Sequence, residues 1–322
     1  RLIENNIEVI GIDNFNAYYD TSLKEARHQY LIKIGKKFNS NFKIHCIDIE
    51  NFEDLKKISS EFKPERFVNL AAQAGVRYSI LNPLTYFKAN LEGFFNILDL
   101  CRLNNVEHLV YASSSSIYGS SSNYPFSEEQ NSNEPLSFYA GTKKSNEMMA
   151  HSFSNIYKIP MTGLRYFTVY GPWGRPDMAL FKFTKNILLG DPIDVYNKGN
   201  MVRDFTYIDD LVEAISLLTN KIPPKPDKRF ENIEGDSISD VAPFRIVNIG
   251  NSHPINLLDY INVLEKILIR KAKINFLDMQ DGDVYKTHSD TKLLKTLKNF
   301  SPTTNLHTGI SEFVKWYKSY YC

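Results

Sequence analysis

Residues 109–119 read LVYASSSSIYG, and residues 137–147 read SFYAGTKKSNE. The first stretch is typical of a buried strand that ends in a cluster of hydroxyl groups, and the second is typical of a helix. Tyr139 and Lys143 are four residues apart on that helix, so their side chains share one face, with Cβ atoms roughly 5 to 6 Å apart. A tyrosine has a pKa of about 10 in water, and an adjacent ammonium group favours the phenolate. Together the two stretches predict a proton acceptor near a group of serines at the carboxyl end of a strand.

Around these stretches, apolar segments of strand length alternate with segments of helical period. Strands are expected at 7–12, 42–47, 67–70, 109–112, 161–166 and 244–248. Helices are expected at 53–62, 84–104, 137–157, 178–189 and 209–218. This alternation indicates βαβ units, and therefore an α/β fold with a Rossmann-like, doubly wound parallel sheet. Ligands bind at the carboxyl ends of the strands in such a fold.

The two ends of the chain differ from this pattern. The polar, proline-containing stretch 221–243 predicts a loop, and the segments after it, with a helix at 255–268, predict a smaller C-terminal lobe. At the start, Leu2, Ile3, Asn5 and Asn6 have the pattern of a last helical turn with an asparagine cap. The chain is therefore expected to begin inside an element.

The composition is that of an ordinary globular protein. The chain has 322 residues, 43% hydrophobic and 23% charged, which excludes disordered, collagen-like and coiled-coil classes. Because 38 lysines and arginines nearly balance 37 acidic residues, binding to nucleic acid or to a membrane is not expected. Three widely spaced cysteines, Cys46, Cys101 and Cys322, predict a reduced, cytoplasmic protein. The seven histidines show no ligand spacing, so no bound metal is expected.

Four further positions place polar or small residues where such a sheet binds ligands. Asp13 follows the first strand, where a carboxylate can accept hydrogen bonds from the ribose of a dinucleotide. The small residues of NLAAQAG (69–75) would let a cofactor approach the backbone closely. Arg175 in GPWGRPDM (171–178) and Arg203 in MVRDF (201–205) suit a carboxylate or a pyrophosphate, which arginine binds as a bidentate fork.

Each feature taken alone also has a purely structural interpretation. The Tyr-Lys spacing fits a surface pair on a helix, and the serines fit a turn that bonds to its own backbone. Asp13 with Asn14 fits a simple turn, 69–75 fits a tightly packed turn, and single arginines usually form surface ion pairs. A strand, a serine cluster and a Tyr-Lys helix in one chain are far more specific than any of them alone.

With these residues assembled, the sequence resembles the extended short-chain dehydrogenase/reductases and, among them, the UDP-glucuronate 4-epimerases of the NAD-dependent epimerase/dehydratase family. The resemblance covers essentially the whole chain. The stretch 171–184, GPWGRPDMALFKFT, is the most diagnostic, because other sugar-nucleotide epimerases share the Tyr-Lys spacing but not this run. The match also includes the preceding LRYFTVY (from Leu164). The other matching segments are GIDNFNAYYD (from Gly11), NLAAQAGVRYS (from Asn69), YASSSSIYG (from Tyr111), YAGTKKSNE (from Tyr139), DVYNKGNMVRDFTYIDD (from Asp194) and VNIGN (from Val247).

The resemblance implies NAD-dependent conversion of UDP-glucuronate to UDP-galacturonate through a transient 4-keto sugar, for the synthesis of surface polysaccharide precursors. It makes Tyr139 the base at the 4-hydroxyl. Lys143 would hold the nicotinamide ribose and lower the pKa of Tyr139, and Ser114, with Ser115 or Ser116, would bind the 4-oxygen. Related dehydratases carry an Asp-Glu pair where this chain has Ser115 and Ser116, so dehydration is disfavoured.

The resemblance also implies two sets of binding residues. The expected cofactor-binding residues are Asp13, Asn14, Asp48, Ile49, Leu70, Ala71, Ala72, Gln73, Asn90, Tyr139, Lys143, Tyr166 and Phe167. The expected substrate-binding residues are Arg77, Thr168, Arg175, Arg203 and Asp283. Within the second set, Arg175 would bind the uronate carboxylate, whereas Arg203 and Asp283 would contact the nucleotide.

The expected organisation is an NAD-binding domain at 1–166 and a mainly UDP-sugar-binding lobe at 167–322. Segments such as 194–214 and 244–250 would return to the first domain. A homodimer is expected through the helices at 84–104 and 137–157. Two alternatives stay open: an epimerase for another UDP-sugar, and a truncated, non-catalytic protein that binds sugar nucleotides.

One departure from the family concerns the start of the chain. Family members begin with a strand and a GxxGxxG turn that binds the pyrophosphate, and this sequence contains no such segment. We therefore expect an N-terminally incomplete chain and a gap in the sheet between the strands at 7–12 and 109–112.

Overall fold

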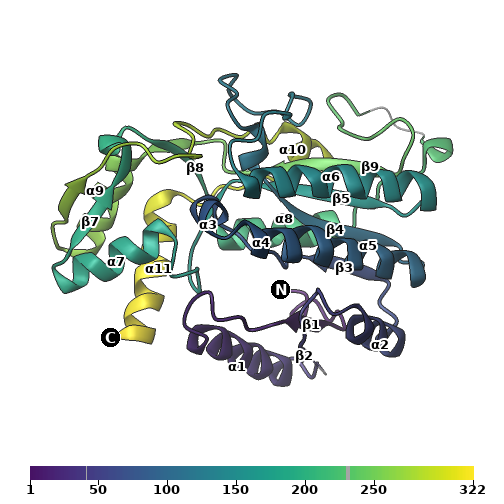
Figure 1. Ribbon diagram of the computed structural model, residues 1–322. Coiled ribbons are helices and arrows are strands. Elements are labelled where there is room, and N and C mark those ends of the chain that lie inside the picture. The colour runs from purple at the N-terminus through teal and green to yellow at the C-terminus, as the bar shows by residue number, and fades with distance from the viewer. Residues whose placement is uncertain (41, 230–232) are drawn as a thin grey trace.

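A parallel sheet of four strands forms the centre of the larger lobe (Figure 1). Its order is β3-β4-β5-β9, with bounds β3 (Arg66–Asn69), β4 (His108–Ser114), β5 (Met161–Tyr166) and β9 (Phe244–Ile249). All three pairings are parallel, so the carboxyl ends of the four strands lie at the same edge of the sheet. The structure is a computed structural model that describes residues 1–40, 42–229 and 233–322. It confirms the predicted α/β fold with a parallel sheet.

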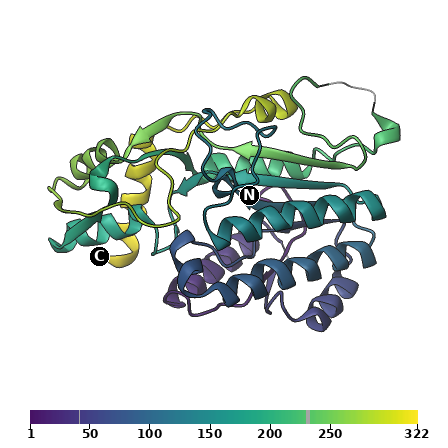
Figure 2. The same cartoon turned by 45° about the horizontal axis from the view of Figure 1, so that its top comes forward.

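Helices cover both faces of this sheet. One face carries α4 (Pro83–Tyr86), α5 (Gly93–Leu103) and α6 (Phe138–Tyr157), of which α5 and α6 run side by side in Figures 1 and 2. The other face carries α8 (Ile208–Thr219) and α10 (Lys292–Lys298). Leu109 and Tyr111 of β4 pack on the side of α5, whereas Val110 between them packs with α8. Both faces of the strand are buried, which explains why the sequence is apolar throughout instead of alternating.

The N-terminal elements form a separate sheet. β1 (Ile10–Asp13) pairs in parallel with β2 (Lys43–Cys46), and α1 (Ser22–Lys37) connects them. Figure 1 shows these elements and α2 (Phe52–Phe62) in purple, below the four-stranded sheet. The prediction that a gap in the sheet borders the strand at 109–112 is wrong. β4 is hydrogen-bonded to both β3 and β5, and the edge strand of the four-stranded sheet on that side is β3.

The second half of the chain builds a smaller lobe around aromatic side chains, at the left of Figure 1. Its strands form one sheet of order β10-β8-β6 and one of order β11-β7. The bounds are β6 (Thr168–Tyr170), β7 (Pro192–Val195), β8 (Val202–Tyr207), β10 (Pro254–Asn256), β11 (Lys273–Phe276), α7 (Ala179–Leu189), α9 (Leu257–Leu268) and α11 (Leu306–Tyr321). Phe205 stacks on Tyr260 with ring centroids 4.3 Å apart, and Phe181 and Phe313 belong to the same core cluster. Tertiary packing of rings thus holds this lobe together.

Several elements differ from the expectation. The predicted strand 7–12 begins only at Ile10, after a helical turn that ends at Asn6, whose φ of 56° is left-handed. The predicted helix 84–104 consists of α4, a π-helical segment (Phe87–Glu92) and α5. The helices α1, α3 (Val76–Leu81), α10 and α11 were not predicted. α1 has weak apolar periodicity, since it buries Leu23 and Gly35 and presents mostly polar residues.

The described part of the predicted loop 221–243 contains one short 3₁₀ turn (Pro226–Lys228), and residues 230–232 lie outside the described residues. Among the helices that the structure describes, none is both long and apolar enough to span a membrane.

Candidate active site

Helix α6 carries both residues of the predicted Tyr-Lys pair. The helix begins after Ser137, whose side chain accepts a hydrogen bond from the backbone N–H of Ala140 at 3.2 Å and caps the first turn. That turn holds Tyr139, and Lys143 follows one turn later. The Lys143 ammonium group is buried and donates a hydrogen bond to the backbone carbonyl of Ala112 in β4, at 2.8 Å. This bond ties the helix to the strand that carries the serines.

Tyr139 is partly buried next to the serine cluster. Burial is the largest effect on its hydroxyl and raises its pKa above the ordinary value of 10.0. Hydrogen bonding by Ser114 and the positive charge of Arg175 lower the pKa and oppose this effect. Ser114 and Arg175 thus both favour the phenolate form of Tyr139. Ser114 and Arg175 are therefore both close enough to the Tyr139 hydroxyl to affect its pKa.

Burial also governs Lys143, whose pKa falls to about 8 because its ammonium group is removed from water. A carbonyl dipole compensates a buried charge less well than a carboxylate does. An ammonium group has three N–H donors, and the bond to Ala112 uses one of them. The remaining donors suit the hydroxyl groups of a ligand bound beside β4.

The three predicted serines lie together at the carboxyl end of β4. Ser114 is the last residue of the strand, and Ser115 begins a 3₁₀ turn (Ser115–Tyr118). The Ser114 hydroxyl oxygen accepts a hydrogen bond from the backbone N–H of Ser116 at 3.2 Å and donates to the Ser116 hydroxyl at 3.2 Å. These bonds hold the hydroxyl groups at the end of the strand, beside Tyr139.

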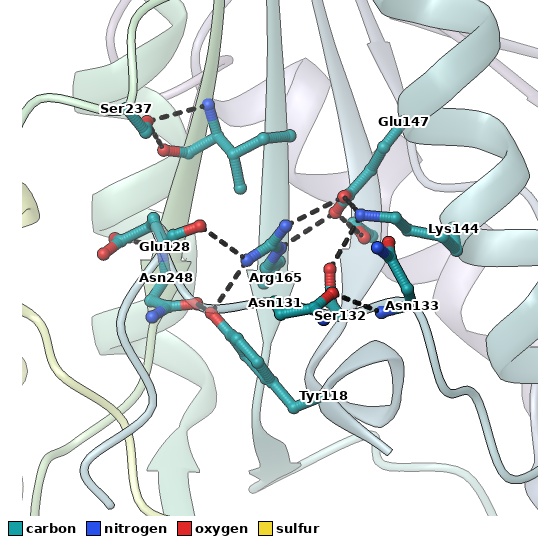
Figure 3. Close-up of polar contacts among 12 residues, drawn as sticks. Tyr118, Glu128, Asn131, Ser132, Asn133, Lys144, Glu147, Arg165, Ser237 and Asn248 are labelled. Carbon is teal, nitrogen blue, oxygen red and sulfur yellow. Dashed lines mark hydrogen bonds and ion pairs between the residues drawn. The ribbon is translucent and has the colours of Figure 1, made fainter. Parts of the chain in front are cut away.

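A buried ion pair, which the sequence did not predict, lies beside the serines (Figure 3). Arg165 of β5 donates to Glu147 of α6 in a bidentate fork, with Nε 2.9 Å from Oε1 and Nη2 2.9 Å from Oε2. Ser113 of β4 donates to the same carboxylate at 2.7 Å, and the guanidinium also donates to the Tyr118 hydroxyl at 3.0 Å. The pair therefore joins α6, β4 and β5, the three elements that surround the predicted site.

Arg175 lies in the turn after β6, where it forms a second bidentate fork. Its Nε is 2.9 Å from Oδ1 of Asp177 and its Nη2 is 2.7 Å from Oδ2. The Tyr18 hydroxyl, from the loop after β1, donates to the same carboxylate at 3.4 Å. Arg175 and Thr168 also line a small cavity of about 50 Å³ in the smaller lobe.

The other predicted substrate-binding residues form a separate polar group. Arg203 donates to Asp283 at 2.8 Å and to the backbone carbonyl of Tyr285 at 3.0 Å. Arg77 lies over the ring of Tyr196, 4.3 Å from its centroid. Burial lowers the pKa of Arg203, and the charge of Arg77 lowers it further, so the two arginines are close. Neighbouring guanidinium groups suit a phosphate-containing ligand.

Among the predicted cofactor-binding residues, those after β1 and β2 lie together. Asp13 ends β1, and its exposed carboxylate accepts a hydrogen bond from the backbone N–H of Phe15 at 2.7 Å. Asn14 donates to the carboxylate of Asp48 at 2.7 Å and so connects the two loops. Ile49 is buried beside them.

The predicted residues after β3 form a loop with an exposed start, since Leu70 and Ala71 are exposed whereas Ala72 is partly buried. Asn90 accepts a hydrogen bond from the backbone N–H of Gln73 at 2.8 Å and donates to its carbonyl at 3.0 Å. The side chain of Asn90 is thus engaged in holding this loop.

Tyr166 is the last residue of β5 and Phe167 follows it, so both lie at the carboxyl end of the strand. Both side chains pack against core clusters.

Together, the parallel sheet with helices on both faces, the Tyr-Lys pair on α6 and the serines at the end of β4 define an enzyme of the short-chain dehydrogenase/reductase type. The chain belongs to the NAD dependent epimerase/dehydratase family, whose model matches residues 1–233.

Three comparisons illustrate this membership. The chain is 50% identical to protein CapI of Staphylococcus aureus over 321 residues, covering 100% of this chain and 94% of the relative. It is 45% identical to a probable UDP-glucuronate 4-epimerase of Rhizobium meliloti (strain 1021), covering 100% of this chain and 93% of that protein. The crystal structure of UDP-glucuronic acid 4-epimerase from Bacillus cereus, in complex with UDP-glucuronic acid and NAD, has a TM-score of 0.85 at 31% identity, covering 99% of this chain and 94% of that one.

The buried Lys143 ammonium group predicts a stability cost that depends on pH. Its pKa is about 8 in the folded chain and 10.5 in the unfolded chain, so between these values the unfolded chain binds more protons and stability rises with pH. Below pH 8 the ammonium group is charged in both states, so the folded chain bears the full free-energy cost of burying this charge. We expect Lys143→Met to be more stable than the unchanged protein at pH 7, by roughly 2 to 3 kcal/mol, with the difference shrinking toward pH 10.

Urea unfolding at pH 7, 8, 9 and 10 measures this difference. Lys185→Met, at an exposed position of α7, is the control and should change the stability little at every pH. A Lys143→Met variant that is less stable at pH 7, or a difference that does not depend on pH, would contradict the prediction.

Proposed function

We propose that this protein is a UDP-glucuronate 4-epimerase that uses NAD and interconverts UDP-glucuronate and UDP-galacturonate. The convergence of Tyr139, Ser114 and Arg175 carries the proposal. These residues combine a proton acceptor, a hydroxyl group that can bind a sugar oxygen, and a cation that can bind a carboxylate. The relatives named as UDP-glucuronate 4-epimerases support the same reaction.

In this proposal Tyr139 removes the proton from the 4-hydroxyl group and returns it after the sugar has turned over. Ser114, with Ser115 or Ser116, holds the 4-oxygen during both steps. NAD, when bound, supplies a reversible hydride acceptor at C4, so the net reaction is an isomerisation. Arg175 binds the uronate carboxylate, because its guanidinium distinguishes this group from the hydroxymethyl group of a neutral hexose by charge and geometry.

Two features of the chain fit the cofactor. Asp13 presents an exposed carboxylate at the end of β1, which suits the hydroxyl groups of the adenosine ribose. Lys143 is buried beside the site and uses one of its three donors within the described chain, which suits the nicotinamide ribose. Asn14, Asp48, Ile49 and the loop at 70–73 would complete the cofactor path, with Asn90 holding that loop in place.

The same proposal assigns the UDP group to Arg77, Arg203 and Asp283. It divides the chain into a cofactor domain at 1–166 and a substrate lobe at 167–322, and two observations support a return of later segments to the first domain. β9 pairs with β5, and α8 packs on the four-stranded sheet. In contrast, β7 pairs with β11, and β8 pairs with β10 and β6, all within the smaller lobe. A cytoplasmic location and a role in surface polysaccharide synthesis stay predictions from the resemblance.

Conversion of the two UDP-uronates by the NAD-loaded protein, followed by chromatography, tests the reaction. We expect Tyr139→Phe to lower kcat by about 10² to 10⁴-fold, because the phenyl ring cannot accept the proton. We expect Arg175→Ala to raise the KM for UDP-glucuronate by about tenfold or more, because a charge-assisted fork is lost.

Tyr157→Phe, at the other end of α6, is the control for loss of a tyrosine hydroxyl and should retain full activity. An unchanged protein that binds NAD but leaves UDP-glucuronate unconverted would refute the function. If it converts UDP-glucose better than UDP-glucuronate, and Arg175→Ala has no effect, an epimerase for another UDP-sugar would replace this proposal.

We also propose that the protein forms a homodimer through α5 and α6. Large apolar side chains are exposed on both helices: Phe95, Leu103, Met148, Ile156 and Tyr157. Phe95 lies 6.0 Å from Phe153 of α6 between ring centroids, so the exposed residues of the two helices form one surface. A surface of this kind favours association with a second apolar surface.

Light scattering after size exclusion tests the dimer. We expect the unchanged protein to have twice the mass of one chain and Met148→Glu with Ile156→Glu to shift it toward a single chain. Ile269→Glu, at an apolar residue that is 90% exposed elsewhere, is the control and should leave the mass unchanged. A monomeric unchanged protein would contradict the proposal.

A further inference from the structure

The turn that carries Arg175 is held from several sides before any ligand binds. Arg27 of α1 donates to the backbone carbonyl of Trp173 at 2.6 Å. The Trp173 ring lies 5.7 Å from the ring of Tyr30 in α1 and 5.3 Å from that of Trp316 in α11, between centroids. The backbone just before Arg175 is therefore fixed between the first helix and the last helix of the chain.

The side chain of Arg175 is fixed by Asp177, two residues further along the same turn. Both oxygens of the Asp177 carboxylate accept hydrogen bonds, one from Nε and one from Nη2 of the guanidinium. Tyr18, in the loop after β1, donates to Oδ2 of the same carboxylate and adds a second hold on Asp177. The two side chains are 32% and 24% exposed, so the pair lies at the wall of the site instead of on the open surface.

This arrangement uses one edge of the guanidinium and leaves the other. A guanidinium group has five N–H donors in a planar fork. The fork to Asp177 takes the Nε donor and one Nη2 donor. Nη2 also lies 3.7 Å from the Met178 sulfur, a weak acceptor that a carboxylate can replace, and neither Nη1 donor is used within the described residues. The Nη1/Nη2 edge, with one N–H from each nitrogen, can bind a second carboxylate in the bidentate manner.

We propose that Asp177 is a positioning residue that holds Arg175 by the Nε/Nη2 edge so that the Nη1/Nη2 edge receives the uronate carboxylate of the substrate. The proposal rests on the proposed function, since it needs a uronate substrate. Arg175 thus bridges two carboxylates, one from the chain and one from the sugar. Asp177 limits the rotamers of a long, flexible side chain before the substrate arrives, which lowers the entropic cost of binding.

The alternative role for Asp177 is competition, in which its carboxylate occupies Arg175 and must leave before the substrate binds. The two roles predict opposite results when Asp177 loses its charge. A positioning residue strengthens binding of the uronate, so its loss weakens binding. A competitor weakens binding of the uronate, so its loss strengthens binding. The direction of the change therefore decides between them.

The test measures the affinities of UDP-glucuronate and UDP-glucose for the NAD-loaded protein by isothermal titration, with Tyr139→Phe in every variant so that neither ligand is converted. We expect Asp177→Asn to weaken the binding of UDP-glucuronate by about tenfold and to change that of UDP-glucose by less than about twofold. An unchanged or tighter affinity for UDP-glucuronate would overturn the proposal. An equal loss for both ligands would overturn it too, because it would show a general structural effect.

The chain offers a matched control in Asp236→Asn. Asp236 forms the same bidentate fork with Arg245, with oxygens 2.8 Å from both Nε and Nη2. Arg245 is the second residue of β9 and lies near the amino end of that strand. We expect this control to leave the ratio of the two affinities unchanged, and a change equal to that of Asp177→Asn would overturn the proposal. If the protein with Tyr139 intact fails to convert UDP-glucuronate, the proposed function fails and this inference with it. If conversion is normal and Asp177→Asn keeps the ratio, this inference alone fails.

Discussion

The ion pair between Glu147 and Arg165 holds together the elements on which the rest of the structure depends. Both side chains are almost completely buried, and each oxygen of the carboxylate accepts one N–H of the guanidinium. Ser113 adds a third hydrogen bond from β4. Because an unpaired buried charge is costly, removing one partner of such a pair typically destabilises a protein by about 3 to 5 kcal/mol. The cost makes any arrangement that separates α6 from β4 and β5 unfavourable.

The position of the candidate site follows from this constraint. Glu147 lies one helical turn beyond Lys143 and two turns beyond Tyr139, while Ser113 directly precedes Ser114. Clamping Glu147 to Ser113 and Arg165 therefore also sets the distance between the tyrosine and the serines.

Two buried cations in this region have different partners. Arg165 meets a carboxylate, which raises the pKa of its guanidinium, whereas Lys143 meets a carbonyl and its pKa falls. Arg165, paired with Glu147, holds the fold together. Lys143 uses one of its three N–H donors within the described chain, so the others can bind a ligand.

The strands of the central sheet and the Tyr-Lys helix could be predicted from sequence, because they depend on local patterns. The run 109–112 is apolar on both faces, and the spacing of Tyr139 and Lys143 needs only a helix. The roles of Glu147, Arg165 and Asp177 could not be predicted in this way. Glu147 and Arg165 are 18 residues apart and meet only because β5 returns beside β4, and Asp177 acquires its role from the rotamer of Arg175.

Helix α1 was not predicted, because its mostly polar surface lacks the apolar periodicity that indicates a helix. Two of its side chains, Arg27 and Tyr30, nevertheless contact Trp173 in the turn that carries Arg175. These contacts join residues about 145 positions apart in the sequence, so no local pattern reveals them. The hydrogen bond from Lys143 to Ala112 could not be predicted either, because helical spacing does not reveal which carbonyl of a neighbouring strand a side chain contacts.

A double-mutant cycle on the buried pair tests the dependence of the fold on it most directly. Glu147→Met, Arg165→Met and the double variant are compared with the unchanged protein by urea unfolding. Each single change should cost about 3 to 5 kcal/mol, and the double change should cost no more than either single change, so less than their sum by about 3 kcal/mol or more, because methionines of similar volume leave no unpaired charge. Losses that simply add would show that the two side chains do not act as a unit, and would contradict the role assigned to the pair.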